Sequence, residues 1–369
     1  MKFNLLIGGL VLLIAGRTAV GADATAEIIA TLKQNYVDRE TLDAQKLNDA
    51  SVAGILQMLG TGAKLLTADE AKSNSVPVIE PNASAHEILA RIEVIQPDIG
   101  YIRVTDVVSE TPLALDAELK KFAQAKVTGY VLDLRFADGT NFAAAAAVAS
   151  RFLPAGVELF TLKHSDGEPQ SYRTTEAPQS LAAELAKQPL LLLVNGQTRG
   201  SAEVLVGALR TQDRGIVIGG LTAGLPAAWQ DYPLSDGRVL RMATAKIAFP
   251  KGKEIFPTGI SPDIQIKIDP KTEHAAVFNV ASNITLTASL QPQLTKHLYS
   301  EATLVKVFHG EGIESPGLTL TNAAAGTTNE LALAGAPAAT ELAPAPARDV
   351  VLQRAVDVLK GIRVFLSWQ

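Results

Sequence analysis

The stretch NGQTRGSAEVLVGAL (195–209) places Ser201 where an apolar run ends at a glycine-containing turn and a helix of small residues is predicted to begin. A turn of this kind can present a serine hydroxyl as a nucleophile. The hydroxyl is weak at neutral pH, so it needs a histidine, or a lysine kept neutral by burial, within hydrogen-bond reach. It also needs backbone N–H groups that stabilise the developing oxyanion.

The histidines do not supply an obvious base. Of the five, His164 lies well inside the predicted α/β region and His274 at its C-terminal end. His164 falls in the polar stretch KHSDGEP, which is typical of a solvated surface loop. No histidines or paired carboxylates have metal-ligand spacing, so we expect neither a metal nor another cofactor. Asp133 lies in the apolar strand VLDLR, where we expect a buried partner of Arg135 or of a backbone group.

Composition excludes several classes of function. The chain has 369 residues, 47% of them apolar, and a net charge of −5 with both signs mixed throughout. Because no basic block occurs, we expect no nucleic-acid partner. Because no cysteine occurs, disulfides, thiolate catalysis and cysteine-based zinc sites are excluded.

The N-terminus, MKFNLLIGGLVLLIAGRTAVGADA, has the layout of a secretory signal peptide: an early lysine, an apolar run, then small residues. We expect residues 1–22 to be removed by cleavage near Ala22, and the protein to be exported, periplasmic or extracellular. The apolar run is shorter than the roughly 20 residues of a membrane span. An uncleaved anchor is the alternative, and peripheral membrane contact and oligomeric state stay open.

An α/β core is predicted to position the turn. Residues 23–72 show helical spacing, with Gly60 and Gly62 ending a helix, and the polar residues 73–87 indicate a linker. Over 88–275, strands alternate with helices, which favours an α/β fold with a mixed, largely parallel sheet. Strands are predicted in ARIEVIQPDIGYIRV, TGYVLDLR, PLLLLVNG and GIVIGG, and helices in TPLALDAELKKFAQAKV, NFAAAAAVASRFL and SAEVLVGALRTQ.

The C-terminal part divides into three segments. Residues 276–321 form an extension with a short helix predicted in SEATLVKVFHGEG. The Ala- and Pro-rich residues 322–347 indicate a flexible linker. Residues 348–369 carry an amphipathic helix, which we expect to pack against the core because its apolar face would otherwise be exposed.

Several stretches together resemble the C-terminal-processing, or tail-specific, serine peptidases. They are DIGYIRVTDV, GYVLDLRFADGTNFAAAAAVASRFLP, PLLLLVNGQTRGSAEVLVGALRTQDRGIVIGGLTAG and YPLSDGRVLRMATAKIAFPKGKEIFPTGISPDI. The resemblance is strong over 88–275 and loose in both flanks. It implies a crotonase-like α/β core and a Ser–Lys catalytic pair, with a glutamine that orients the lysine.

The positions that the resemblance assigns to catalysis hold other residues. The nucleophile slot, three residues before the glutamate of the helix, holds Gly200; the lysine slot holds Leu225; the glutamine slot holds Trp229. None of these side chains can attack a carbonyl or accept a proton. A PDZ domain, which most members insert before the core, needs about 80–100 residues, more than the segment before the core offers, so we expect none.

A shift of register does not restore the pair. Ser201 is one residue after the nucleophile slot, which turns its side chain by about 100° on a helix. No lysine lies between Lys187 and Lys246. We therefore expect Ser201 to satisfy backbone N–H groups at the helix start, with a relocated nucleophile as the alternative.

The resemblance also places backbone oxyanion donors at Gly139 and Ser201, and such donors survive side-chain replacement. The leading hypothesis is a pseudopeptidase that binds a peptide, a protein C-terminus or a homologous protease. The second is an active serine endopeptidase that uses Ser201. A third is a small-molecule carrier whose apolar cleft would be lined by Leu225, Pro226 and Trp229.

Overall fold

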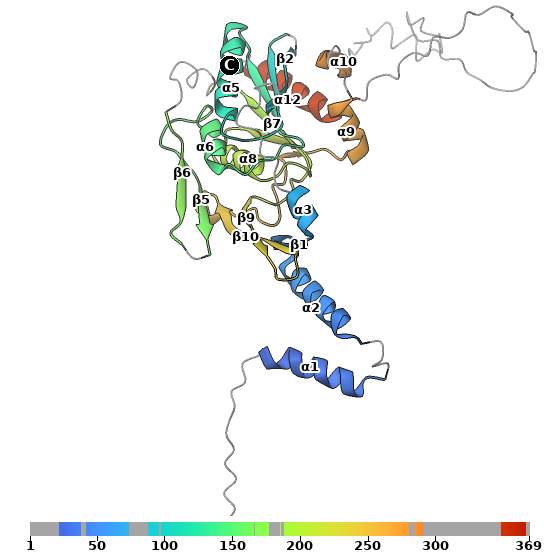
Figure 1. Cartoon of the computed structure of the whole chain (residues 1–369). Coiled ribbons are helices and arrows are strands. Elements are labelled where there is room, and N and C mark those ends of the chain that lie inside the picture. Colours follow the sequence, from blue (N-terminus) through green and yellow to red (C-terminus); the bar gives the residue numbers. More distant parts are fainter. Residues whose placement is uncertain are drawn as a thin grey trace, which may run out of the picture. The chain divides into compact units, whose positions relative to one another are not determined.

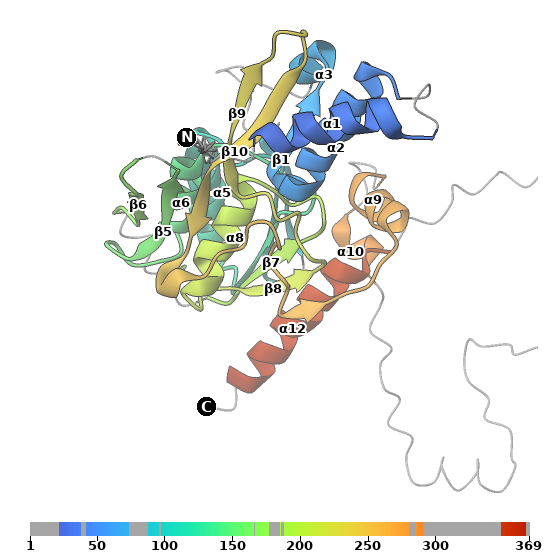
Figure 2. The same ribbon diagram turned by 90° about the horizontal axis from the view of Figure 1, so that it is seen from below.

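The computed structural model describes residues 22–37, 42–73, 88–95, 97–165, 167–176, 185, 188–279, 285–290 and 348–366. They form two compact units, drawn in Figures 1 and 2. The first contains the described residues up to Ser73 with Trp229–Ala243, and the second contains the remainder. The predicted signal peptide, most of the linker at 73–87, the linker at 322–347 and the helix predicted over 300–312 lie outside the described residues. Within the described ranges, no helix has the length and apolar character to cross a membrane.

The first unit consists of helices and a small antiparallel sheet. Helices α1 (Ala22–Asn35) and α2 (Ala44–Leu59) form where the apolar spacing predicts them, and Asp43 caps α2 by accepting a hydrogen bond from Lys46 N (2.7 Å). The helical prediction is wrong for β1 (Ala63–Leu66), whose four residues are too few to show a period and which pairs antiparallel with β10. The unit also includes η2 (Gly60–Gly62), α3 (Ala68–Ser73), most of β9 (Ala227–Pro233) and the first part of β10 (Val239–Ala248).

The second unit is built on a six-stranded sheet with the order β11-β8-β7-β4-β3-β2. Every neighbouring pair is parallel except β2 with β3, so the predicted mixed, largely parallel α/β fold is confirmed. Strands β4 and β7 are buried along their whole length, as their apolar runs predict. Strand β3 is also buried throughout, although it includes Arg103. The strands are β2 (Leu89–Ile95), β3 (Ile99–Val104), β4 (Gly129–Asp133), β7 (Leu190–Val194), β8 (Ile216–Gly219) and β11 (Ile264–Gln265).

Helices cover both faces of this sheet, as Figure 1 shows. On one face, α5 (Thr111–Gln124), α6 (Phe142–Ala149) and α8 (Ser201–Thr211) pack into the larger core. On the other face, α10 (Leu286–Ser289) and α12 (Val350–Leu366) pack into a second core, and α9 (Pro270–Phe278) precedes α10 in the chain. Helix α12 forms within the predicted C-terminal helix and contacts β7 and β8, as its apolar face requires.

A shorter antiparallel ladder in the second unit joins β5 (Glu158–His164) to β6 (Gln170–Arg173) and to the second half of β10. The 3-10 turn η3 (Pro250–Gly252) follows β10. His164 is the last residue of β5 and its side chain is exposed. The prediction that His164 is solvated is therefore confirmed, although it ends a strand rather than lying in a loop.

A buried ion triad joins α12 to the sheet. The Arg135 guanidinium contacts Asp133 (Nη2–Oδ2 2.6 Å) and also Asp349 (Nη1–Oδ1 2.9 Å, Nη2–Oδ2 2.7 Å). The Tyr101 hydroxyl donates to Asp133 Oδ2 (2.7 Å). The prediction that Asp133 is a buried partner of Arg135 is thus confirmed. Burial alone would raise the pKa of Asp133, but the charge and hydrogen bonds of Arg135 hold that pKa below its ordinary value.

Replacing Asp349 by alanine should lower the free energy of unfolding by about 3–5 kcal/mol, because it leaves part of the buried Arg135 charge unpaired. Urea unfolding at pH 7 measures this loss. Asp357→Ala, on a partly exposed side of the same helix, is the matched control and should cost less than about 1 kcal/mol. Equal losses in the two variants would show that the triad does not hold α12 in place.

Candidate functional site

The turn between β7 and α8 is held by two buried polar residues, Asn195 and Thr198. Asn195 Oδ1 accepts hydrogen bonds from Phe136 N (3.1 Å) and Gln197 N (3.0 Å). Thr198 Oγ1 donates to Leu134 O (2.8 Å). These bonds attach the turn to the segment after β4, so the predicted nucleophile slot lies beside the predicted oxyanion segment.

Gly200, in the predicted nucleophile slot, directly precedes α8 with φ 60° and ψ −132°. This positive φ favours glycine, because a Cβ is disfavoured there. A Cβ at residue 200 would overlap the carbonyl oxygen of Gly139 and lie 3.1 Å from Asp138 Oδ1. A serine side chain therefore has no room at this position unless the loop at 138–139 moves.

Ser201, the alternative nucleophile, is fully buried at the first position of α8. Its Oγ donates to Val107 O (2.9 Å), and its backbone N–H donates to Gly139 O (2.8 Å). Across the described residues, no amine or imidazole hydrogen-bonds to the Ser201 hydroxyl. The expectation that the Ser201 side chain caps α8 is wrong: Gly200 is the N-cap residue, and the hydroxyl instead binds the carbonyl of a distant segment.

The two predicted oxyanion donors, Gly139 and Ser201, lie together, but both N–H groups bind acceptors within the chain. The Gly139 N–H donates to Asp138 Oδ1 (2.7 Å), and Asp138 Oδ2 accepts a hydrogen bond from Arg199 Nε (2.7 Å). Gly139 has φ 137°, and a Cβ there would overlap Ser201 Oγ. A ligand carbonyl can therefore reach these donors only if the loop at 138–139 separates from α8.

Glu203 holds the loop that carries the predicted lysine slot, a role that the sequence reasoning missed. Its Oε1 accepts hydrogen bonds from Thr222 Oγ1 (2.5 Å) and Gly224 N (2.8 Å), and its Oε2 accepts one from Leu225 N (2.8 Å). Burial raises the pKa of Glu203, although these hydrogen bonds act against the rise. The signal is a single acid in the apolar helix SAEVLVGAL, because a buried carboxyl group requires hydrogen-bond partners.

The predicted cleft-lining residues fall in both units. Leu225 is half-buried and Pro226 is buried, and both belong to the second unit. Trp229 is half-buried in β9 and belongs to the first unit, so its place beside Leu225 stays a prediction. Within the described ranges, no group of histidine, aspartate and glutamate side chains could hold a metal ion.

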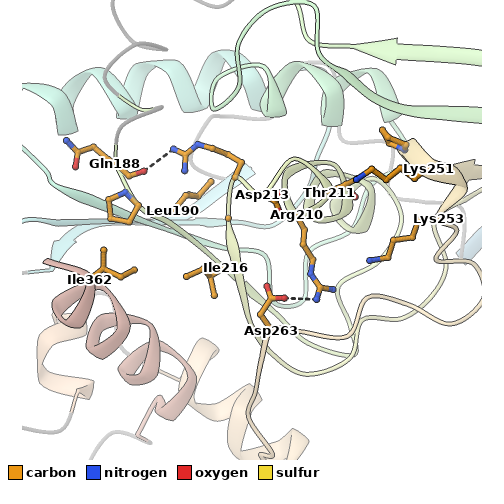
Figure 3. A pocket seen from close by; sticks show the side chains of 14 residues that line it. Gln188, Leu190, Arg210, Thr211, Asp213, Ile216, Lys251, Lys253, Asp263 and Ile362 are labelled. Atoms are coloured by element: carbon orange, nitrogen blue, oxygen red, sulfur yellow. Dashed lines mark hydrogen bonds and ion pairs between the residues drawn. The ribbon is translucent and has the colours of Figure 1, made fainter. Parts of the chain in front are cut away.

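A pocket of about 790 Å³ lies at the amino-terminal ends of β7 and β8 (Figure 3), whereas the Gly200 turn follows the carboxyl end of β7. Its arginines are already engaged: Arg210 pairs with Asp263 (2.5 Å), and Arg214 donates to the carbonyls of Leu185 (2.5 Å) and Gln188 (3.1 Å). The pocket is therefore separate from the candidate site.

Comparison with known proteins supports the resemblance to the C-terminal-processing peptidases. Residues 98–266 match the model of peptidase family S41. The chain is 26% identical over 253 residues to a carboxy-terminal-processing protease of Bartonella bacilliformis, covering 66% of this chain and 56% of that protein. It is 32% identical over 173 residues to the chloroplastic C-terminal processing peptidase of Tetradesmus obliquus, covering 47% and 36%. The chain thus spans about half, or less, of the length of these relatives.

The fold is also found among solved structures. A Parabacteroides merdae protein described as a peptidase aligns with a TM-score of 0.50 and 15% identity, covering 69% of this chain and 84% of that one. At this identity the likeness shows the fold alone. The matched residues include β4 with Asp133, the β7–α8 turn, and Glu203 with the loop that it holds at 222–225. Over residues 98–266 the α/β core thus matches peptidase family S41, and the relatives that it resembles are C-terminal-processing peptidases.

Proposed function

We propose that this chain is a non-catalytic member of the family that binds a peptide or protein without cleaving it. The observation that carries the proposal is the packing at Gly200, where the backbone of Gly139 fills the space a nucleophile would need. The nearby Ser201 hydroxyl is buried and donates to a carbonyl. Leu225, which cannot accept a proton, stands in the lysine slot and is held there by Glu203.

The proposed ligand is the C-terminus of a peptide or protein, or a homologous protease. Two relatives are named for the processing of carboxyl termini, which supports a peptide ligand for the shared core. The N–H groups of Gly139 and Ser201 are backbone donors, so replacing catalytic side chains does not remove them. The signal-like N-terminus supports an exported location, where the ligand would be an envelope or extracellular protein.

The protein should not react with a fluorophosphonate probe, because no base hydrogen-bonds to Ser201 among the described residues and its buried hydroxyl donates to Val107 O. Gel-based labelling of the purified chain tests this, with an active tail-specific peptidase as the positive control. Labelling of the wild-type chain that disappears in Ser201→Ala would establish the active serine endopeptidase instead.

Peptides with free C-termini should bind saturably and remain intact. Isothermal titration calorimetry with peptides of varied C-terminal residues measures binding, and mass spectrometry of the recovered peptides measures cleavage. Absence of saturable binding to every peptide would overturn the proposed function, and cleavage would overturn its non-catalytic character.

Gly200→Ser should destabilise the protein more than a control that also has a positive φ but no overlap. Gly156 provides that control: its φ is 81°, and a Cβ there meets nothing within 4 Å. A positive φ costs a non-glycine residue about 1–2 kcal/mol, so Gly156→Ser should lose that amount and Gly200→Ser clearly more. Urea unfolding compares the two. Equal losses would show that the 138–139 loop yields easily and that a serine fits.

A further inference from the structure

Arg103 lies on the face of the sheet opposite α8. It is the penultimate residue of β3, and strand alternation places its side chain on the same face as that of Tyr101. Tyr101 belongs to the core formed with α12, whereas the intervening Ile102 belongs to the core formed with α8. The Arg103 side chain therefore projects from the sheet face opposite the one that α8 covers.

The Arg103 side chain is buried and has no polar partner among the residues that the structure describes. The residue is only 8% exposed, and its Nε makes no hydrogen bond. Among the described residues, no carboxylate or other acceptor bonds to its guanidinium; the contact it makes is with the Phe278 ring, 4.2 Å from Cζ to the centroid. By contrast, Arg135 on the neighbouring strand segment contacts two carboxylates. A buried charge without such a partner is costly, and a ring face offsets only part of that cost.

The neighbouring strand adds positive charge beside Arg103. Arg91 of β2 is its register partner across the antiparallel pair. The register partner on the other side, in β4, is Asp133, whose carboxylate is already bonded to Arg135 and Tyr101. Like charges at paired positions repel, so the Arg91–Arg103 pair favours a further anion nearby. Glu93 does not supply that anion to Arg103, because it pairs with Arg91 (3.0 Å) and accepts a hydrogen bond from Leu286 N (2.9 Å).

Three aromatic rings gather beside Arg103. Phe278 stacks on His274 (centroids 4.4 Å apart), and Phe136 meets both rings edge-on, at 5.1 Å from Phe278 and 5.7 Å from His274. His274 is exposed and Phe278 is 45% exposed, so the rings present an apolar surface to solvent. Phe136 holds φ 62°, a conformation that an aromatic residue rarely adopts and that places its ring in the cluster.

We propose that Arg103 and these rings form a site for a peptide carboxylate that lies next to an apolar side chain. The carboxylate supplies the missing partner of the guanidinium, and the apolar side chain packs on Phe278 and His274. The site lies at the carboxyl ends of β3 and β4, where open α/β sheets commonly bind ligands. The inference rests on the proposed peptide-binding function and names the group recognised.

Calorimetry with N-acetylphenylalanine tests the site directly. The full chain should bind it saturably, and it should bind the neutral amide, N-acetylphenylalanine amide, about tenfold or more weakly, because the charged hydrogen bond is lost. N-acetyl-Asp-Phe amide separates the two sources of a carboxylate: tighter binding than the free acid would assign the site to an acidic side chain rather than to a C-terminus. Equal binding of the acid and the neutral amide would overturn the proposal.

Two matched variants locate the binding. Arg103→Met should weaken N-acetylphenylalanine binding about tenfold or more and raise the ligand-free Tm, because it removes an unpaired buried charge. Arg354→Met removes the same charge from an exposed position on α12 and should leave both values unchanged. Phe278→Ala, at an exposed ring, should also weaken binding.

Unchanged affinity in Arg103→Met, with or without a lowered Tm, would show that Arg103 has a structural role only. Tail peptides that still bind Arg103→Met normally would leave the proposed function standing while overturning this site.

Discussion

The buried contact between Arg135 and the carboxylates of Asp133 and Asp349 is the constraint on which much of the second unit depends. It joins residues 214 positions apart in the sequence through hydrogen bonds within the protein interior. An arginine there can be accommodated only when its charge is fully partnered. Helix α12 is thereby attached to the end of β4, next to the segment that carries Phe136 and the 138–139 loop.

That segment brings together the features that would matter for peptide chemistry. Asn195 and Thr198 bond the β7–α8 turn to it, so Gly200 and Ser201 lie against Gly139. The contact is close because neither glycine has a side chain. The N–H groups of Gly139 and Ser201 are taken up by the protein's own acceptors, the Asp138 carboxylate and the Gly139 carbonyl, and the same loop fills the space beside Gly200.

Most of the core architecture could be predicted from the sequence. The continuous apolar runs of β4 and β7 and the helix stretches between strands indicate a largely parallel sheet, because strands buried on both faces lack polar positions. The acid in VLDLR was correctly expected to be buried beside Arg135. The short strand β1 was missed, because four residues do not show a period.

The sequence by itself determined the fold class, the family resemblance, and the residues that occupy the catalytic slots, because these depend on local pattern and spacing. Tertiary structure decided what those residues do. Ser201 binds Val107 rather than capping its helix, and Glu203 holds the Leu225 loop. It also buried Arg103 against the Phe278 ring, with no acceptor for the guanidinium among the described residues. Each of these facts depends on which distant backbone groups or side chains pack nearby, and such contacts leave no periodic trace in the chain.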